Sequence, residues 1–260
     1  MTPTRTHWIL LIAVTLIVIV SVFFSSFLLN AGIVPPIIHT PYGFVIIQSA
    51  IPDSPREIPI YRGILREGDI LDLYVEKTNN SEQRVVSIEE ALSLARLVIV
   101  EYGGLPSDAE PWGPHIQYGE KFNSDTGEII EKIPVRTSMG YYRRINGLPI
   151  EGYSDRIYID FGINGEKWFF KRWRTLEYTG TNTAIISPQA ALVKMSRGEI
   201  LDPPKCCLNV FFVKNISPGY FEKYPLLNVE DPVIEFEPVW VLTGILPDGD
   251  SWSVSIPARV

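Results

Sequence analysis

The first feature of the hydrophobic pattern is an unbroken apolar run near the N-terminus. From Trp8 to Leu29 the chain holds 22 residues without a charge. As a helix, this run reaches roughly 33 Å, which is enough to cross the hydrocarbon core of a bilayer. The pattern predicts a transmembrane helix over residues 8–29 that acts as a signal anchor.

The charges that flank this run predict its orientation. Arg5 precedes it, whereas the first charge after it is Asp53. The positive-inside rule then keeps residues 1–7 in the cytoplasm and sends the rest of the chain across a cell membrane. Cleavage after the small residues Ala31 and Gly32 is the alternative, but the run is longer than the apolar region of a typical signal peptide. The sequence therefore predicts a single-pass protein with an extracytoplasmic C-terminal domain.

Prolines dominate the next segment, residues 30–59. They stand at positions 35, 36, 41, 52, 55 and 59, and each removes a backbone donor and favours extended structure. We expect a stalk here, in which the apolar stretch Tyr42–Ile47 either forms a strand or lies against the domain. The loose alternation of Tyr61–Val75 predicts a further strand.

An internal repeat is the clearest pattern in the remaining chain. The segment Ser87-Ile-Glu-Glu-Ala-Leu92 is matched 100 residues later by Ser187-Pro-Gln-Ala-Ala-Leu192. Ser87 and Glu90 form a capping box, and Ser187 is an N-cap followed by proline at the first helical position. Apolar residues recur at helical spacing after both serines, so we expect each helix to cover a sheet.

Turn signals form the second part of the repeat. Asn164-Gly165 and Asp248-Gly249 supply the positive φ angles of tight hairpins, and β-rich stretches flank both. Each half then contains one helix followed by about three antiparallel strands. The predicted fold class is α+β: an N-terminal transmembrane helix and two tandem helix-on-antiparallel-sheet units, over residues 60–180 and 181–260.

The charge distribution excludes one class of partner and suggests another. The chain has a net charge of −7, whereas nucleic-acid binding requires a basic surface. Residues 143–174 differ, because seven basic and four acidic residues give them a net charge of +3. These positions are either solvated faces of strands or a contact surface for an acidic partner, polymer or lipid headgroup. The candidate partner-binding residues are Arg143, Arg144, Arg156, Lys171, Arg172 and Arg174.

No motif in the sequence predicts catalytic residues, a cofactor or a metal site. The histidines stand far apart, at positions 7, 39 and 115, and the sequence has no His-Glu-x-x-His pair, no Cys-x-x-Cys pair and no phosphate-binding glycine loop. The acidic pairs Asp69/Asp72 and Glu235/Glu237 stand at strand-like spacing and are the basis for a hydrolase as an alternative.

Two further features concern covalent modification. Cys206 and Cys207 are adjacent and point to opposite faces of a strand, which disfavours a bond between them. Asn79 and Asn215 fit the glycosylation sequon and are candidate glycosylation sites.

Several turn and packing residues carry a resemblance to a known family. They are the segment Asn146–Gly152, the strand Asp155–Phe161, the Asn164-Gly165 turn, Pro238-Val-Trp240 and Asp248-Gly249. From Tyr61 to Val260 the chain resembles the PepSY-like superfamily, and in particular the membrane-anchored, duplicated ectodomains of YycH/YycI-type regulatory proteins. The resemblance implies paired helix-on-sheet modules and an association with inhibiting secreted peptidases or restraining sensor kinases. It transfers no functional residue, because the matched positions are structural.

Together these patterns predict a non-catalytic, membrane-anchored domain that binds or regulates another envelope protein. The expected partners are membrane lipid through residues 8–29 and an envelope protein, but no nucleic acid. One alternative is a structural or ligand-holding envelope module, in which strand tryptophans stack on a ligand instead of serving the core: Trp168, Trp173, Trp240 and Trp252. An envelope hydrolase or a pilin-like subunit are further alternatives, although Thr6-His7-Trp8 stands where a pilin carries its basic-Gly processing site.

Overall fold

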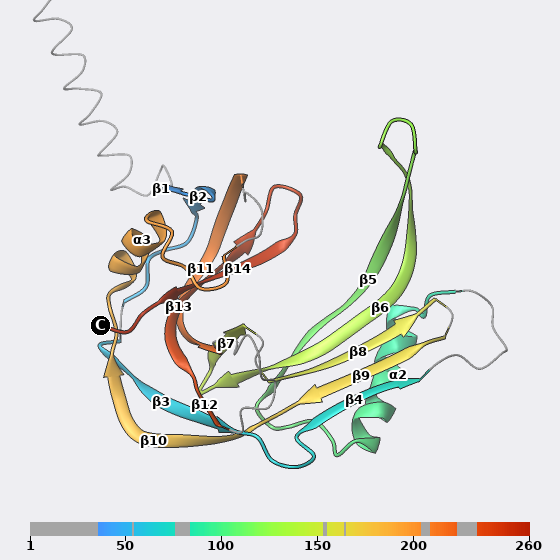
Figure 1. The fold of residues 1–260 in the computed structure, drawn as a ribbon, viewed down its shortest axis with the longest axis horizontal. Helices are drawn as coiled ribbons and strands as arrows, with labels where there is room; N and C mark the ends of the chain where they lie inside the picture. Colours follow the sequence, from blue (N-terminus) through green and yellow to red (C-terminus); the bar gives the residue numbers. More distant parts are fainter. Residues whose placement is uncertain are drawn as a thin grey trace, which may run out of the picture.

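The computed structural model shows a molecule built mainly of β-strands (Figure 1). It describes residues 36–53, 55–75, 84–152, 155–163, 165–203, 209–222 and 233–260. Strands hold 59% of these residues and helices 12%. The expected α+β class is therefore wrong, and a mainly β class replaces it.

A curved antiparallel sheet forms the first half of the molecule. Its strands are β4 (Ile70–Val75), β5 (Ala109–Phe122), β6 (Ile129–Ile145), β8 (Arg156–Gly162) and β9 (Lys167–Arg172). They lie in the order β5-β6-β8-β9-β4. The long strands β5 and β6 extend past the others as a hairpin (Figure 1).

Helix α2 (Ile88–Glu101) covers one face of this sheet. Its N-cap is Ser87, whose Oγ accepts a hydrogen bond from the Glu90 backbone N–H at 3.2 Å, as the sequence predicts. The buried Ala91, Ala95 and Ile99 form the inner face of the helix. They pack against apolar side chains of β6, β8 and β9 and the following loop, which are Met139, Ile157, Ile159, Phe161, Phe169 and Trp173.

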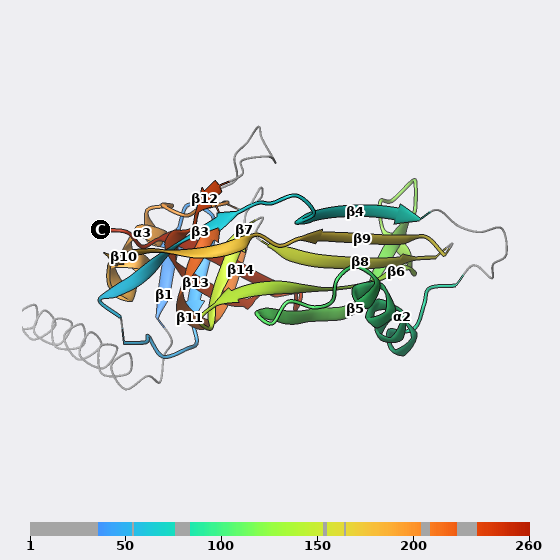
Figure 2. The same ribbon diagram turned by 90° about the horizontal axis from the view of Figure 1, so that it is seen from below.

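Strand β11 (Asn209–Glu222) organises the second half. It pairs antiparallel with β13 (Glu237–Ile245), which continues to β14 (Ser251–Pro257). It also pairs in parallel with β2 (Gly43–Ile47), beside β1 (Ile37–Thr40), and with β7 (Leu148–Gly152). Because β7 forms a hairpin with β6, the strands of both halves belong to one connected sheet (Figure 2).

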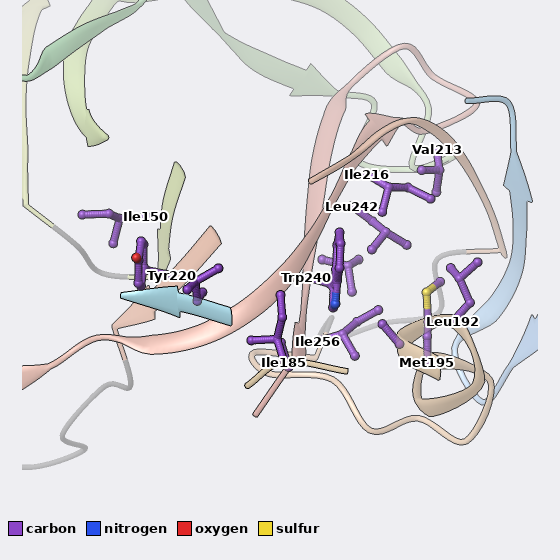
Figure 3. Close-up of a cluster of buried hydrophobic side chains, with 14 of the residues drawn as sticks. Ile150, Ile185, Leu192, Met195, Val213, Ile216, Tyr220, Trp240, Leu242 and Ile256 are labelled. Carbon is purple, nitrogen blue, oxygen red and sulfur yellow. The ribbon is translucent and has the colours of Figure 1, made fainter. Parts of the chain in front are cut away.

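The larger core lies between these strands, helix α3 (Pro188–Ser196) and a small sheet (Figure 3). The small sheet has the order β10-β3-β12 and consists of β3 (Glu57–Ile64), β10 (Thr175–Ala184) and β12 (Val233–Glu235). Ser187 caps α3 and Pro188 opens it, as predicted. The fully buried Trp240 donates its Nε1–H to the Ile186 carbonyl at 2.9 Å, which satisfies its one polar group.

This topology corrects the expectation of two tandem units. Strand β7 falls in the first expected unit and β11 in the second, yet the two pair with each other, and β12 likewise pairs with β3. Within the expected stalk, β2 confirms the strand expected at Tyr42–Ile47, but Val45, Ile47 and Ile58 are buried in the larger core and do not belong to a free stalk. Pairing between distant segments leaves no local signal in a sequence, and this is the physical reason for both errors.

The predicted turns agree with the structure where it describes them. Asn146, with a φ of 51°, and Gly147, with a φ of 79°, join β6 to β7. Gly249 has a φ of 93° between β13 and β14, and Gly165 has a φ of 81° between β8 and β9. Asn164 lies outside the described residues. A positive φ at these glycines costs no steric energy, so each hairpin closes without strain.

The predicted transmembrane helix over residues 8–29 lies outside the described residues, as do residues 1–7. Within the ranges given above, no helix has both the length and the apolar character needed to cross a bilayer. The described residues thus give no support to the expected single-pass, signal-anchored location in a cell membrane, which we withdraw.

Candidate functional site

The uncovered faces of the two halves meet across a cleft of about 470 Å³. Strands β5, β6 and β8 wall it on one side, β11, β13 and β14 on the other, and β7 lies between them (Figure 1). The volume falls within the range of about 300–1,000 Å³ that is usual for small-molecule sites. The residues that line the cleft are Trp112, Tyr141, Tyr142, Arg144, Pro149, Ile150, Glu151, Gly152, Arg156, Ile157, Tyr158, Asn215, Ser217, Thr243 and Ser253.

Aromatic rings form the wall on the side of the first half. Trp112 on β5 and Tyr158 on β8 have ring centroids 6.0 Å apart, and Tyr142 on β6 lines the same wall. Gly140 stands directly opposite Trp112, and a Cβ added to it would lie 3.5 Å from the indole. An added Cβ would clash with the Ile157 carbonyl oxygen, so the close approach of β8 to β6 requires a glycine at this position. Trp112 is 43% exposed, so its ring is accessible to a ligand.

Hydroxyl and amide groups form the opposite wall. Asn215 on β11 is directly opposite Thr243 on β13, which is directly opposite Ser253 on β14. Directly opposed residues in a sheet share a face, so the three form one row across three strands. Ser217 adds a second polar side chain on β11. The other face of these strands is buried in the larger core.

The charges at the base of the cleft are paired. The Arg144 Nε lies 2.7 Å from the Glu110 Oε2, and the Arg144 Nη1 donates to the Gly147 carbonyl at 2.8 Å. Glu151 on β7 accepts a hydrogen bond from the Ser253 Oγ at 2.9 Å. Burial raises the pKa of the Glu151 carboxyl, although the Ser253 hydrogen bond and nearby Arg144 act to lower it.

A second hollow, of about 440 Å³, continues the same face of the first-half sheet toward β4. Trp168 on β9 and Tyr74 on β4 stand directly opposite each other in its lining. The Trp168 ring centroid lies 5.5 Å from that of Tyr158, so aromatic contacts link this hollow to the cleft. Two of its charges are also paired with each other, since the Arg136 Nη1 lies 2.9 Å from the Asp160 Oδ2.

Three of the predicted partner-binding residues are buried and do not lie on the surface. Arg143, Arg172 and Arg174 are only 5%, 7% and 2% exposed. Two buried carboxylates, Asp155 and Glu222, account for this burial. Their ion pairs join the first-half sheet to the end of β11, so these arginines hold the halves together and do not form a contact surface.

The distances in this buried network are short. Asp155 lies 2.5 Å from Arg143 and 3.1 Å from Arg174, and Glu222 lies 3.0 Å from Arg174 and 3.2 Å from Arg172. Burial raises the pKa of Glu222 and lowers that of Arg172, so each charged form depends on the charge of its partners. Arginine suits this role, because its planar guanidinium can bond two carboxylates at once.

The other three predicted partner-binding residues lie in different places. Arg144 and Arg156 line the cleft, and the Arg156 Cζ lies 5.8 Å from the centroid of the Phe170 ring. Lys171 is on the opposite face of the sheet, where its Nζ donates to the Tyr102 carbonyl at 3.2 Å, just past the end of α2. The six residues therefore do not form one surface.

The remaining sequence candidates do not assemble into a site. His115 packs on Trp112 and His39 on Phe44, with ring centroids 4.5 and 4.6 Å apart. Asn215 is exposed within the cleft wall. His7, Asn79, Cys206 and Cys207 lie outside the described residues. In the part of the chain that is described, no group of three or more His, Cys, Asp and Glu residues is arranged to hold a metal ion.

The acidic pairs that suggested a hydrolase are held by other contacts. Asp72 accepts a hydrogen bond from the Trp168 Nε1 at 2.6 Å, and Asp69 accepts one from the Arg66 backbone N–H at 2.8 Å. Glu235 lies 3.5 Å from the Arg259 guanidinium. These contacts give each of the three carboxylates a structural partner.

Sequence reasoning missed the aromatic wall, although β8 contains a signal for it. In that strand Ile157, Ile159 and Phe161 pack in the core with α2, while Arg156 and Tyr158 line the cleft and Asp160 lines the second hollow. Because successive residues of a strand point to opposite faces, a tyrosine that alternates with apolar core residues indicates the accessible face. Among the strand tryptophans, Trp168 lies on this face, whereas Trp173 and Trp240 are buried in the two cores.

Comparison of the chain with protein-family models finds no match, and comparison with curated proteins finds none either. The resemblance to the PepSY-like superfamily therefore stays a prediction, and the functional argument rests on the site.

Proposed function

We propose that this protein is a non-catalytic binding protein that holds its ligand in the cleft between its two halves. The observation that supports this most is that the two walls of the cleft differ in chemistry. Aromatic rings, Trp112 among them, face a row of hydroxyl and amide groups across a cleft with a volume of about 470 Å³. Ligand sites combine apolar rings with a few placed polar groups in this way. Of the roles expected from the sequence, this is the ligand-holding one.

The charges of the cleft favour binding over catalysis. Hydrolysis of a glycosidic bond requires two cooperating carboxylates, and Glu151 is the single carboxylate among the described residues that line the cleft. Glu110, nearby, is paired with Arg144. The Ser253–Glu151 hydrogen bond is the contact that a nucleophilic hydrolase would use, so the test includes Glu151.

The test places a photoreactive phenylalanine analogue at Trp112 in the full-length protein. We expect irradiation in cells to attach one discrete species at this position. The matched control carries the analogue at Gln189, an exposed position on α3 that lines neither hollow, and stays unmodified. Equal labelling at the two positions, or none at Trp112, would rule out the cleft as the binding site. Turnover of the captured species that is lost in Glu151→Gln would show an enzyme.

Regulation of a partner protein is a second candidate, supported by the outer part of the β5–β6 hairpin, residues 118–134. This hairpin projects away from the rest of the molecule (Figure 1). It exposes large apolar side chains, and patches of this kind mark contact sites. They are Tyr118, Phe122, Ile129, Ile130 and Ile133.

Photocrosslinking also tests this candidate, with the photoreactive phenylalanine analogue placed at Phe122. We expect a protein adduct at Phe122 that is absent at Gln189 and is lost when Ile130 is changed to Ser. An adduct that survives Ile130→Ser, or the absence of any adduct, would remove the hairpin as a docking element.

A further inference from the structure

We propose that the cleft takes a linear, uncharged oligosaccharide that lies across the strands from β5 toward β4. This inference rests on the function proposed above and names the class of its ligand. It follows from the line of aromatic rings, the chemistry of the facing wall and the pairing of the charges.

The aromatic rings form a continuous line on the uncovered face of the sheet. Trp112, Tyr158 and Trp168 follow one another with centroids 6.0 and 5.5 Å apart, and Tyr74 stands opposite Trp168. Four strand spacings of about 4.8 Å separate β5 from β4, so the line crosses roughly 19 Å. A ligand that uses both hollows must therefore be elongated, and one sugar ring is too short to do so.

Sugar rings suit both walls of the cleft. The face of an aromatic ring carries partial negative charge, and the C–H bonds of a sugar ring carry partial positive charge, so the two stack. Sugar hydroxyls both donate and accept hydrogen bonds, as do the hydroxyls of Thr243 and Ser217 and the amide of Asn215. The aromatic rings would then stack on one side of the sugar chain, and the polar row would form hydrogen bonds with the hydroxyls on the other side.

The paired charges favour an uncharged ligand. The guanidinium of Arg144 already lies 2.7 Å from Glu110, and that of Arg136 lies 2.9 Å from Asp160. An anionic ligand would have to compete with a carboxylate at both of these arginines. Uncharged hydroxyl groups can bond at the rims of these ion pairs without breaking them.

The spacing of the rings disfavours a proline-rich peptide, which is the other ligand that uses aromatic surfaces. Such a peptide inserts its proline rings into slots between aromatic side chains. Centroids 5.5 to 6.0 Å apart mean that Trp112, Tyr158 and Trp168 contact one another. Trp112 and Tyr158 are tilted by 31°, and Trp168 stands edge-on to Tyr158 at 73°, so the contacting rings leave no slots between them.

The experiment measures, by calorimetry on the full-length protein, the binding of three neutral linear hexasaccharides: maltohexaose, cellohexaose and chitohexaose. We expect one of them to bind, and to bind roughly tenfold or more tightly than the disaccharide of the same sugar. Tyr74→Ala should lower only the hexasaccharide affinity, since Tyr74 lies in the second hollow. Trp112→Ala should lower both affinities. Circular dichroism spectra confirm that each variant is folded.

The matched control is Tyr178→Ala, which removes a tyrosine of similar exposure, 52% against 60% for Tyr74, that lines neither hollow. We expect this variant to bind like wild type. Equal losses in Tyr74→Ala and Tyr178→Ala, or equal affinity for hexasaccharide and disaccharide, would overturn the elongated site. If no saccharide binds while the Trp112 analogue captures a peptide, the ligand class is wrong and the cleft remains the site. If no saccharide binds and nothing is captured, both proposals fail.

Discussion

Asp155 is fully buried and forms ion pairs with two buried arginines, Arg143 and Arg174. Replacing it by Asn keeps the volume but leaves two guanidinium groups short of a negative charge. Loss of one partner from a buried ion pair costs about 3–5 kcal/mol. We therefore expect Asp155→Asn to lower the free energy of unfolding by an amount in this range, as measured by urea denaturation.

An exposed ion pair provides the control for this variant. Glu199 lies 3.9 Å from Arg197, and both side chains are solvated. Exposed pairs contribute roughly 0–1 kcal/mol, so Glu199→Gln should be nearly neutral. Equal stability of the two variants would mean that the Asp155 network does not hold the halves together.

Glu151 predicts a pH dependence of stability. Its pKa is raised above the ordinary value of 4.5, chiefly by burial. A carboxyl with a raised pKa in the folded state stabilises the fold below its unfolded pKa, and this contribution is lost as the pH rises through the folded pKa. The stability of wild type relative to Glu151→Gln should therefore fall as the pH rises from below 4.5, and should level off above the raised pKa. Parallel stability profiles from urea denaturation across this window would contradict the assignment.

At the residue scale, the sequence predicts that two of the buried arginines share a face, but it does not predict their burial. Strand alternation places Arg172 and Arg174 on one face, and both do contact Glu222. Their burial could not be predicted, because Glu222 lies 48 residues after Arg174 and only the pairing of β11 with β7 brings it there. An exposed basic surface and a buried ion network share the same local pattern.

At the scale of elements, the helix caps were predictable because a cap is a local interaction. Ser87→Ala removes the acceptor of the Glu90 backbone N–H and should destabilise the fold by about 1 kcal/mol. Ser93 provides the control: it is exposed in the middle of α2 and bonds back to the Glu89 carbonyl. Ser93→Ala should be neutral or slightly stabilising, because alanine has the higher helix propensity. Thermal unfolding of both variants followed by circular dichroism tests this, and a larger loss at Ser93 would refute the assigned cap.

The strands were harder to predict than the helices for a physical reason. The turn at Asn146-Gly147 fixes the β6–β7 hairpin from local chemistry. In contrast, β11 pairs in parallel with β2, about 165 residues earlier in the chain, and nothing near either strand specifies that choice. The prolines around β1 and β2 therefore indicated a stalk, although Val45 and Ile47 of β2 are buried in the larger core.

At the scale of the whole molecule, the larger core draws on segments from the entire described chain. Five of its buried residues precede residue 181: Val45, Ile47, Ile58, Ile145 and Ile150. Burial of one such side chain contributes about 1.5–3 kcal/mol. Together they contribute roughly 10 kcal/mol, which is comparable to the net stability of about 5–15 kcal/mol of a typical domain.

A fragment of residues 181–260, the second of the two expected units, should therefore not fold alone. It lacks these five side chains, and β11 loses its pairing with both β2 and β7. We expect its urea denaturation to show no cooperative transition by circular dichroism, while mixing with a fragment of residues 36–180 restores strand signal and cooperativity. A sharp transition in the isolated fragment would mean that this half is an independent domain. The cleft would then lie between two separately folded parts joined by β7 and the buried arginines, and its width could change when a ligand binds.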